Sequence, residues 1–142
     1  LVCLVGSEMC IRDRTKADHV TPEQHPNLVS LLQQMVHPAW QTASYENIEM
    51  SCISMASIQA TKTGFINRGT ESVPAIQGIT LDEQPLTIFP GEVPKKLPQQ
   101  SFWQNEGFEF TAFRPLPSSV DDPLPHIRID KALEYLIGDK LK

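Results

Sequence analysis

The sequence predicts a small single domain of the α+β class, a mostly antiparallel sheet packed by an N-terminal and a C-terminal amphipathic helix. Apolar residues recur at helical spacing near both ends of the chain, and alternating apolar patterns lie between them. A length of 142 residues fits one domain with a modest core.

The first residues differ in kind from the rest. The stretch CLVGSEMCIRDR, residues 3–14, resembles the translation of a transposase adapter used in sequencing libraries, which indicates a metagenome-derived sequence. It does not fit a secretory signal, because nothing basic precedes the apolar run and no small-residue cleavage site follows it. We therefore expect residues 1–14 to be a non-native, adapter-derived segment. Residues 15–142 then form the single α+β domain, whose natural N-terminus could be truncated, as in a fragment of a larger protein.

The amino-acid composition limits the kinds of partner and the cellular compartment that we expect for this protein. The net charge is −5 and there is no basic run, which argues against nucleic acid and against an anionic membrane surface. Once residues 1–14 are set aside, Cys52 is the remaining cysteine, so no intrachain disulfide framework can form. No apolar run approaches the roughly 20 residues of a membrane-spanning helix. These features predict a cytoplasmic protein.

The N-terminal helix is expected at about residues 26–36. Thr21 and Gln24 have the spacing of a capping box and predict a turn before it. Pro38 should end the helix. Its apolar face is Leu28, Leu31, Leu32, Met35 and Val36.

The middle of the chain is ambiguous between helix and strand over residues 45–60. Its β-branched residues favour a strand, and the change of phase at Cys52-Ile53 predicts a bulge. From Asn47 to Thr61 the only charged residue is Glu49, so the segment should be buried or covered by a partner.

Further along, two apolar pairs mirror each other about residues 82–84 and predict a hairpin, with Pro85 on an edge strand. The alternation in GFEFTAF, residues 107–113, predicts another strand. Pro-rich stretches at 90–100 and 114–125 read as extended connectors.

A second amphipathic helix should close the chain, with Asp130 as its N-cap and Gly138 near its end. Its apolar residues are Ile129, Ala132, Leu133, Leu136, Ile137 and Leu141. We expect both helices and the middle segment to share one apolar layer.

The strongest candidate site precedes this helix. In an extended backbone His126, Arg128 and Asp130 would point to one side, where the guanidinium and imidazole could hold a carboxylate or phosphate. We take these three as the predicted ligand-binding residues. The alternative is a solvated edge on which Asp130 merely caps the helix.

The sequence gives little indication of a catalytic cysteine, a metal site or a phosphate-binding loop. No histidine is placed near Cys52 by its spacing, so we expect an inert buried thiol. His19 and His25 lack metal-ligand spacing and are expected at the surface. Neither GxxxxGK[ST] nor GxGxxG occurs. The sequence therefore predicts no catalytic residue, no metal and no cofactor.

Two classes of function remain. The sequence favours a non-catalytic module that binds a protein or a small anionic ligand. The alternative is a small enzyme that acts on an anionic carboxylate or phosphate substrate through His126, Arg128 and Asp130.

Overall fold

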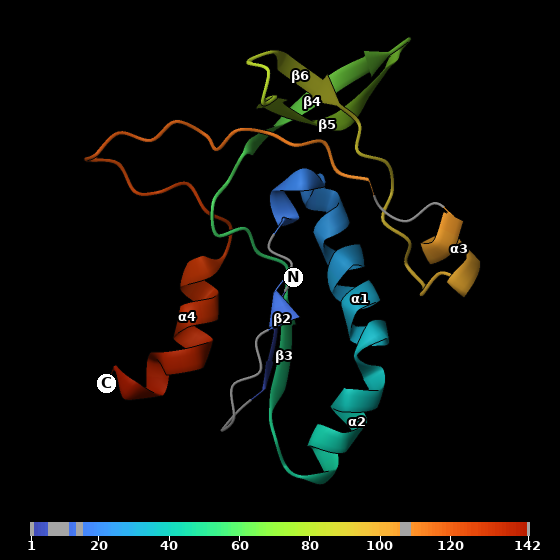
Figure 1. The fold of residues 1–142 in the computed structure, drawn as a ribbon, viewed down its shortest axis with the longest axis vertical. Coiled ribbons are helices and arrows are strands. Elements are labelled where there is room, and N and C mark those ends of the chain that lie inside the picture. The colour runs from blue at the N-terminus through green and yellow to red at the C-terminus, as the bar shows by residue number, and fades with distance from the viewer. Residues whose placement is uncertain (1, 6–11, 14–15, 106–108, 142) are drawn as a thin grey trace.

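A computed structural model describes residues 2–5, 12–13, 16–105 and 109–141 and confirms the α+β class (Figure 1). The helices are α1 (His25–Met35), α2 (His37–Tyr45), α3 (Gln100–Asn105) and α4 (Ile129–Ile137). The strands are β1 (Val2–Val5), β2 (Arg12–Asp13), β3 (Met50–Ile53), β4 (Thr61–Arg68), β5 (Glu71–Ile79) and β6 (Pro85–Ile88). Short 3₁₀ helices cover η1 (Ala17–His19), η2 (Pro22–Gln24) and η3 (Gly138–Lys140).

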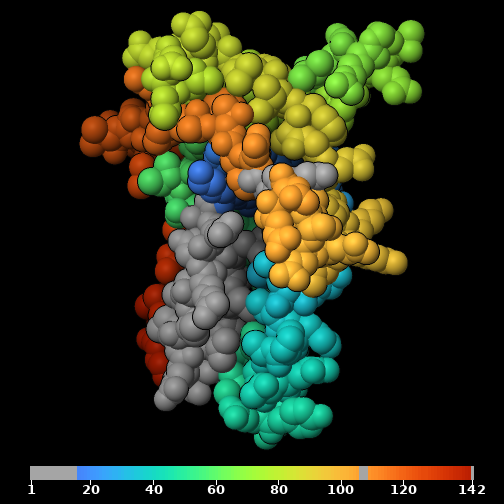
Figure 2. Space-filling view, turned by 45° about the vertical axis from the view of Figure 1, so that its right-hand side comes forward, coloured from blue at the N-terminus to red at the C-terminus, as the bar shows by residue number. Residues whose placement is uncertain are grey.

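The described strands form two antiparallel sheets, in the orders β2-β1-β3 and β4-β5-β6. Helices α1 and α2 lie on one side of β3, and α4 lies on its other side (Figure 1). The second sheet lies beyond the N-terminal end of α1, and its β4–β5 end projects from the body of the molecule (Figure 2).

The predicted hairpin is confirmed as β5–β6, with Ile79 opposite Pro85 and Ile76 opposite Ile88. Pro85 is the first residue of β6, which lies at the edge of its sheet. A missing N–H is tolerated at such an edge, because no further strand pairs with it there. The longer β4–β5 hairpin was not predicted, and Gly69 turns its chain with a positive φ of 65°.

Helix α1 and the turn before it are confirmed, but Pro38 does not end the helical region. The chain breaks at Val36 and starts α2 at His37, with Pro38 in the first turn. A proline is tolerated there because the first N–H groups of a helix have no intrahelical acceptor.

In the middle segment a strand is confirmed for Met50–Ile53 only. The predicted bulge is wrong, since the strand ends where the bulge was expected. Beyond it, an isolated bridge joins Ala56 to Ile127 through backbone hydrogen bonds of 3.0 and 2.8 Å.

The strand predicted at 107–113 is also wrong within the described residues, and Phe108 lies outside them. Phe113 forms only an isolated bridge with Thr80, and Arg114 donates its N–H to the Ile79 carbonyl at 2.7 Å. Phe113, one of the apolar residues of that alternating pattern, instead packs against Ile76 of the second sheet in a buried cluster.

Helix α4 ends at Ile137, next to Gly138 as predicted, and continues as η3. Its N-cap is Arg128 and not Asp130, which lies in the first turn. The Asp130 carboxylate is still favourable there, because it faces the positive end of the helix dipole.

Among the residues that the structure describes, the apolar core is divided among three clusters, so the prediction of one shared layer is wrong. One joins Met55 and Ala132 to Ile53, Ile129 and Leu136, a second holds Val20, Leu28, Leu31 and Val93, and a third holds Ala60, Ile76, Leu86, Ile88 and Phe113. Leu133 and Leu141 of the terminal stripe are 49% and 74% exposed. Within the described ranges, no helix is both long and apolar enough to cross a membrane.

Candidate functional site

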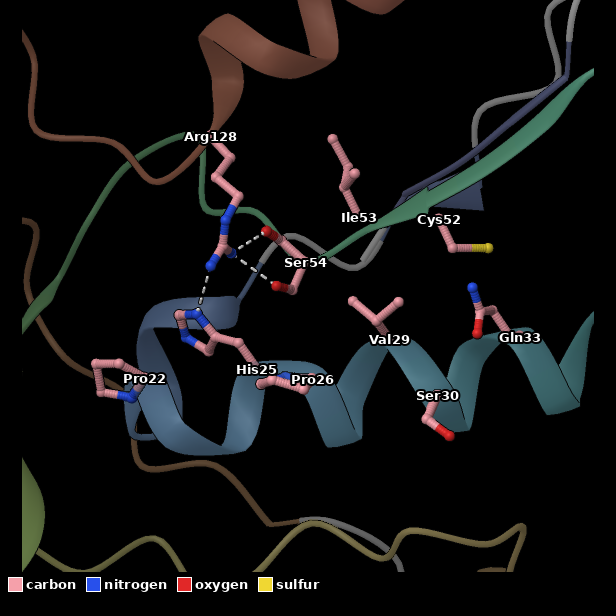
Figure 3. A pocket seen from close by; sticks show the side chains of 10 residues that line it. All are labelled: Pro22, His25, Pro26, Val29, Ser30, Gln33, Cys52, Ile53, Ser54 and Arg128. Carbon is pink, nitrogen blue, oxygen red and sulfur yellow. Dashed lines mark hydrogen bonds between the residues drawn. The ribbon is translucent and has the colours of Figure 1, made fainter.

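A cavity of about 430 Å³ lies between α1, the end of β3 and the start of α4 (Figure 3). Its walls are Pro22, His25, Pro26, Val29, Ser30, Gln33, Cys52, Ile53, Ser54 and Arg128. Three segments that are remote in sequence therefore contribute to one hollow.

Arg128 is the charged group of this cavity. Its Nη1 donates to the carbonyl oxygen and to Oγ of Ser54, both at 2.7 Å, and its Nη2 donates to Nδ1 of His25 at 3.2 Å. A guanidinium carries five N–H donors, so one on Nη2 and the one on Nε remain. No carboxylate of the described residues forms an ion pair with Arg128.

The backbone at Arg128 is left-handed, with φ 55° and ψ 23°. A residue with a Cβ adopts this region at a cost on the order of 1 kcal/mol or more, so the surrounding contacts must hold it there. The bridge of Ile127 to Ala56 on one side and the start of α4 on the other impose this turn. It directs the guanidinium back toward β3 and α1 (Figure 3).

His25 is buried, with 6% of its surface exposed, and both ring nitrogens have partners. Its Nε2 lies 2.8 Å from the carbonyl oxygen of Ala17, which only accepts, and its Nδ1 faces Arg128, which only donates. The partners therefore select the neutral tautomer with the proton on Nε2. Burial, and then the charge of Arg128, lower the pKa of His25, although the bond to Ala17 opposes this.

This arrangement predicts a stability that falls with acidification. Above the unfolded pKa of about 6.5 both states keep His25 neutral, whereas below it the unfolded chain binds a proton that the folded ring resists. The free energy of unfolding should therefore decline as the pH falls below about 6.5. Urea titrations at several pH values measure this slope, and His25→Gln should make it shallower.

His37→Gln is the matched control, since it makes the same replacement at an exposed position. Buried His19, whose pKa is also lowered chiefly by burial, should account for the slope that remains in the His25 variant. An identical slope in wild type and His25→Gln would contradict the neutral, buried assignment of His25.

A second polar cluster ties η1 to the start of β4. The Oδ2 atom of buried Asp18 accepts the N–H of Ala60 at 2.7 Å, and Thr61 Oγ1 donates to the Asp18 carbonyl. His19 packs its ring against Phe110 and Phe113, both at 5.8 Å between centroids, and its Nδ1 has no hydrogen-bond partner. The expectation that His19 and His25 lie at the surface is wrong for both, since each is 6% exposed.

The structure separates the three residues predicted to bind a ligand. Arg128 lines the cavity, whereas His126 and Asp130 do not, although all three residues are exposed. The segment is not extended throughout, because Arg128 has a left-handed backbone, but exposure alternates as expected: the three polar residues are exposed, and Ile127 and Ile129 between them are partly buried. Sequence reasoning missed His25 and Ser54, which partner Arg128 from 103 and 74 residues away, and no local pattern marks such distant pairs.

Cys52 lines the same cavity as His25, which its spacing did not predict. Figure 3 places Cys52 over Gln33, at the far end from His25. Residues 25 and 33 of a helix are about 12 Å apart along its axis, so the cavity separates thiol and imidazole. In the ranges that the structure describes, no three His, Cys, Asp or Glu side chains gather closely enough to hold a metal ion.

Comparison with known proteins assigns the chain to a family. The chain belongs to the YcjX-like family, DUF463, whose model matches residues 13–141. It is 58% identical over 129 residues to the Ras-like GTPase YcjX of Escherichia coli K12, an alignment that covers 90% of this chain and 28% of that protein. It is 39% identical over 132 residues to the Ras-like GTPase YcjX of Shewanella oneidensis MR-1, covering 90% and 27%.

The chain thus spans little more than a quarter of the length of these curated relatives. The interpretation as a metagenome-derived, non-catalytic binding module is wrong, because the chain belongs to the YcjX-like family and these two relatives, each from a defined bacterial strain, are named Ras-like GTPases. The sequence argument failed because it looked for a phosphate-cradling motif that these 142 residues do not contain.

Proposed function

We propose that this chain acts as part of a GTP-hydrolysing protein. The observation that carries the proposal is its 58% identity, over 90% of its length, to a protein named a Ras-like GTPase. GxxxxGK[ST] is absent from the sequence, so this segment does not supply that phosphate loop. Its contribution would be made together with residues of a longer polypeptide.

Within that role, the cavity lined by Arg128 is the proposed binding site for an anionic ligand. GTP is anionic and is therefore a candidate for this ligand. Two N–H donors of Arg128 are not used within the described structure, and no described carboxylate neutralises its charge. Charge-assisted bonds from a guanidinium to phosphate are strong and directional. Of the three residues predicted from sequence, Arg128 thus becomes the principal proposed ligand, and exposed His126 and Asp130 flank it.

A chimera tests the function. Residues 13–141 of this chain replace the aligned segment of the E. coli relative, and GTP hydrolysis and GTP affinity are measured. We expect the chimera to hydrolyse GTP. A chimera that folds, as judged by a cooperative thermal transition, but neither binds nor hydrolyses GTP would overturn the proposal.

Arg128→Ala in the same chimera tests the site. We expect GTP to bind about 10-fold more weakly, the loss of roughly one charge-assisted hydrogen bond. Arg114→Ala is the matched control, because Arg114 pairs with Glu83 on the surface and should leave affinity unchanged. If Arg128→Ala lowers the melting temperature and leaves GTP affinity intact, Arg128 only joins Ser54 to His25.

A further inference from the structure

Strand β3 is covered on both faces. On one face Ile53 and the following Met55 pack against Ile129, Ala132 and Leu136 of α4. On the other, Cys52 and Ser54 share a cavity wall with residues of α1. Figure 1 shows the same arrangement, with β3 between the two helical layers.

A strand in such a position needs other strands at its edges. Helices on both faces reduce the access of water to the backbone, so pairing within a sheet is the favourable way to satisfy its N–H and C=O groups. The sequence MSCISM is free of charge, as is typical of strands buried on both faces. An open edge here would leave buried backbone groups unpaired or invite another strand.

The strand that fills this edge is β1. It runs antiparallel to β3, with Val2 opposite Ile53, Cys3 opposite Cys52, Leu4 opposite Ser51 and Val5 opposite Met50. Among the described residues, β1 is the only strand that pairs with β3. Yet Val2–Val5 lie outside the family match, which begins at residue 13, and residues 3–14 read as adapter.

We propose that the β3 edge held here by Val2–Val5 is the pairing site for an apolar strand from the remainder of a YcjX-like polypeptide. Strand β1 stands in for it. Its sequence, Val-Cys-Leu-Val, is uncharged and of high β propensity. Main-chain hydrogen bonds supply the affinity and the covering helices select apolar side chains.

A strand from the same polypeptide is the occupant that the lengths of the relatives favour. The alignments leave about 72% of the E. coli relative outside the matched region, which is ample to contain the missing strand. A strand within the same polypeptide would also pair at high effective concentration, which a separate partner lacks. The inference rests on family membership and not on GTP hydrolysis, so each can fail alone.

Hydrogen–deuterium exchange without nucleotide tests the inference. The measured peptides are Met50–Ile53 in this chain and its aligned counterpart in the intact E. coli relative. The chain is studied with Leu4→Pro, which removes a backbone N–H of β1 opposite Ser51. We expect the β3 peptide to exchange at least about 100-fold more slowly in the intact relative than in the Leu4→Pro chain.

The β4–β5 hairpin is the internal control, because its two strands pair with each other inside the matched region and should be similarly protected in both proteins. Rapid exchange of the β3 counterpart in the intact relative, with β4–β5 protected, would overturn the proposal. Protection that appears only at concentrations where the relative dimerises would also overturn it, by making a second copy the occupant.

Discussion

Leu31→Ala is expected to lower the free energy of unfolding by about 2–4 kcal/mol. Leu31 is 4% exposed and forms a cluster with Val20, Val93 and the partly buried Leu28. This small cluster packs α1 against Val20, which follows η1, and against Val93 in the connector after β6. Because the cluster is small, few neighbouring side chains can move into the cavity that the substitution leaves. Urea unfolding followed by circular dichroism gives the change.

Leu81→Ala is the matched control for this prediction. The same atoms are removed, but Leu81 is 60% exposed in the loop before β6, so the change should stay within about 0.5 kcal/mol. Equal effects of the two substitutions would show that the cluster around Leu31 does not form in solution.

Gly78→Ala is expected to destabilise the chain by about 1–3 kcal/mol. A Cβ on Gly78 would lie 2.6 Å from Cδ1 and 3.0 Å from Cγ of Phe113, and 3.1 Å from the Ala60 carbonyl oxygen. Phe113 is 8% exposed and packs between Ala60 and Ile76, so the ring cannot move away without opening the cluster. The melting temperature and urea midpoint measure the loss.

Gly64→Ala provides the control, because its Cβ would meet its nearest neighbours at 3.7 Å or more, an ordinary contact. It should be neutral or slightly stabilising, because alanine gives the unfolded chain less conformational entropy to lose on folding than glycine does. Adding Phe113→Leu to Gly78→Ala should cost less than the sum of the two single changes. Strict additivity would argue that the ring and the Gly78 backbone do not touch.

Local patterns predicted the elements whose signals lie within one segment. Helix α1 follows from apolar residues at helical spacing, α4 from a stripe that ends near Gly138, and β5–β6 from a mirrored apolar pattern. Predictions failed where context decided the outcome. Pro38 begins a helix because a break at Val36 precedes it, and Arg128 replaces Asp130 as N-cap because Ile127 is bridged to Ala56.

The candidate site was only partly accessible to such reasoning. Arg128 was identified by its residue type, since a guanidinium is suited to anions. Its companions His25 and Ser54 come from other elements, and their position depends on how η2, β3 and α4 pack together. The membership of a family with GTPase-named relatives could not be predicted either, because neither GxxxxGK[ST] nor GxGxxG occurs in this sequence.

By itself, the sequence determined the acidic balance, the two amphipathic helices and the uncharged middle strand, because each is a property of neighbouring residues. Tertiary structure alone decided that His25 is buried and neutral, that Arg128 turns inward, and that β3 lies between helices with one edge filled by Val2–Val5. Those outcomes depend on contacts between segments far apart in the chain, where burial and hydrogen-bond geometry outweigh local preference.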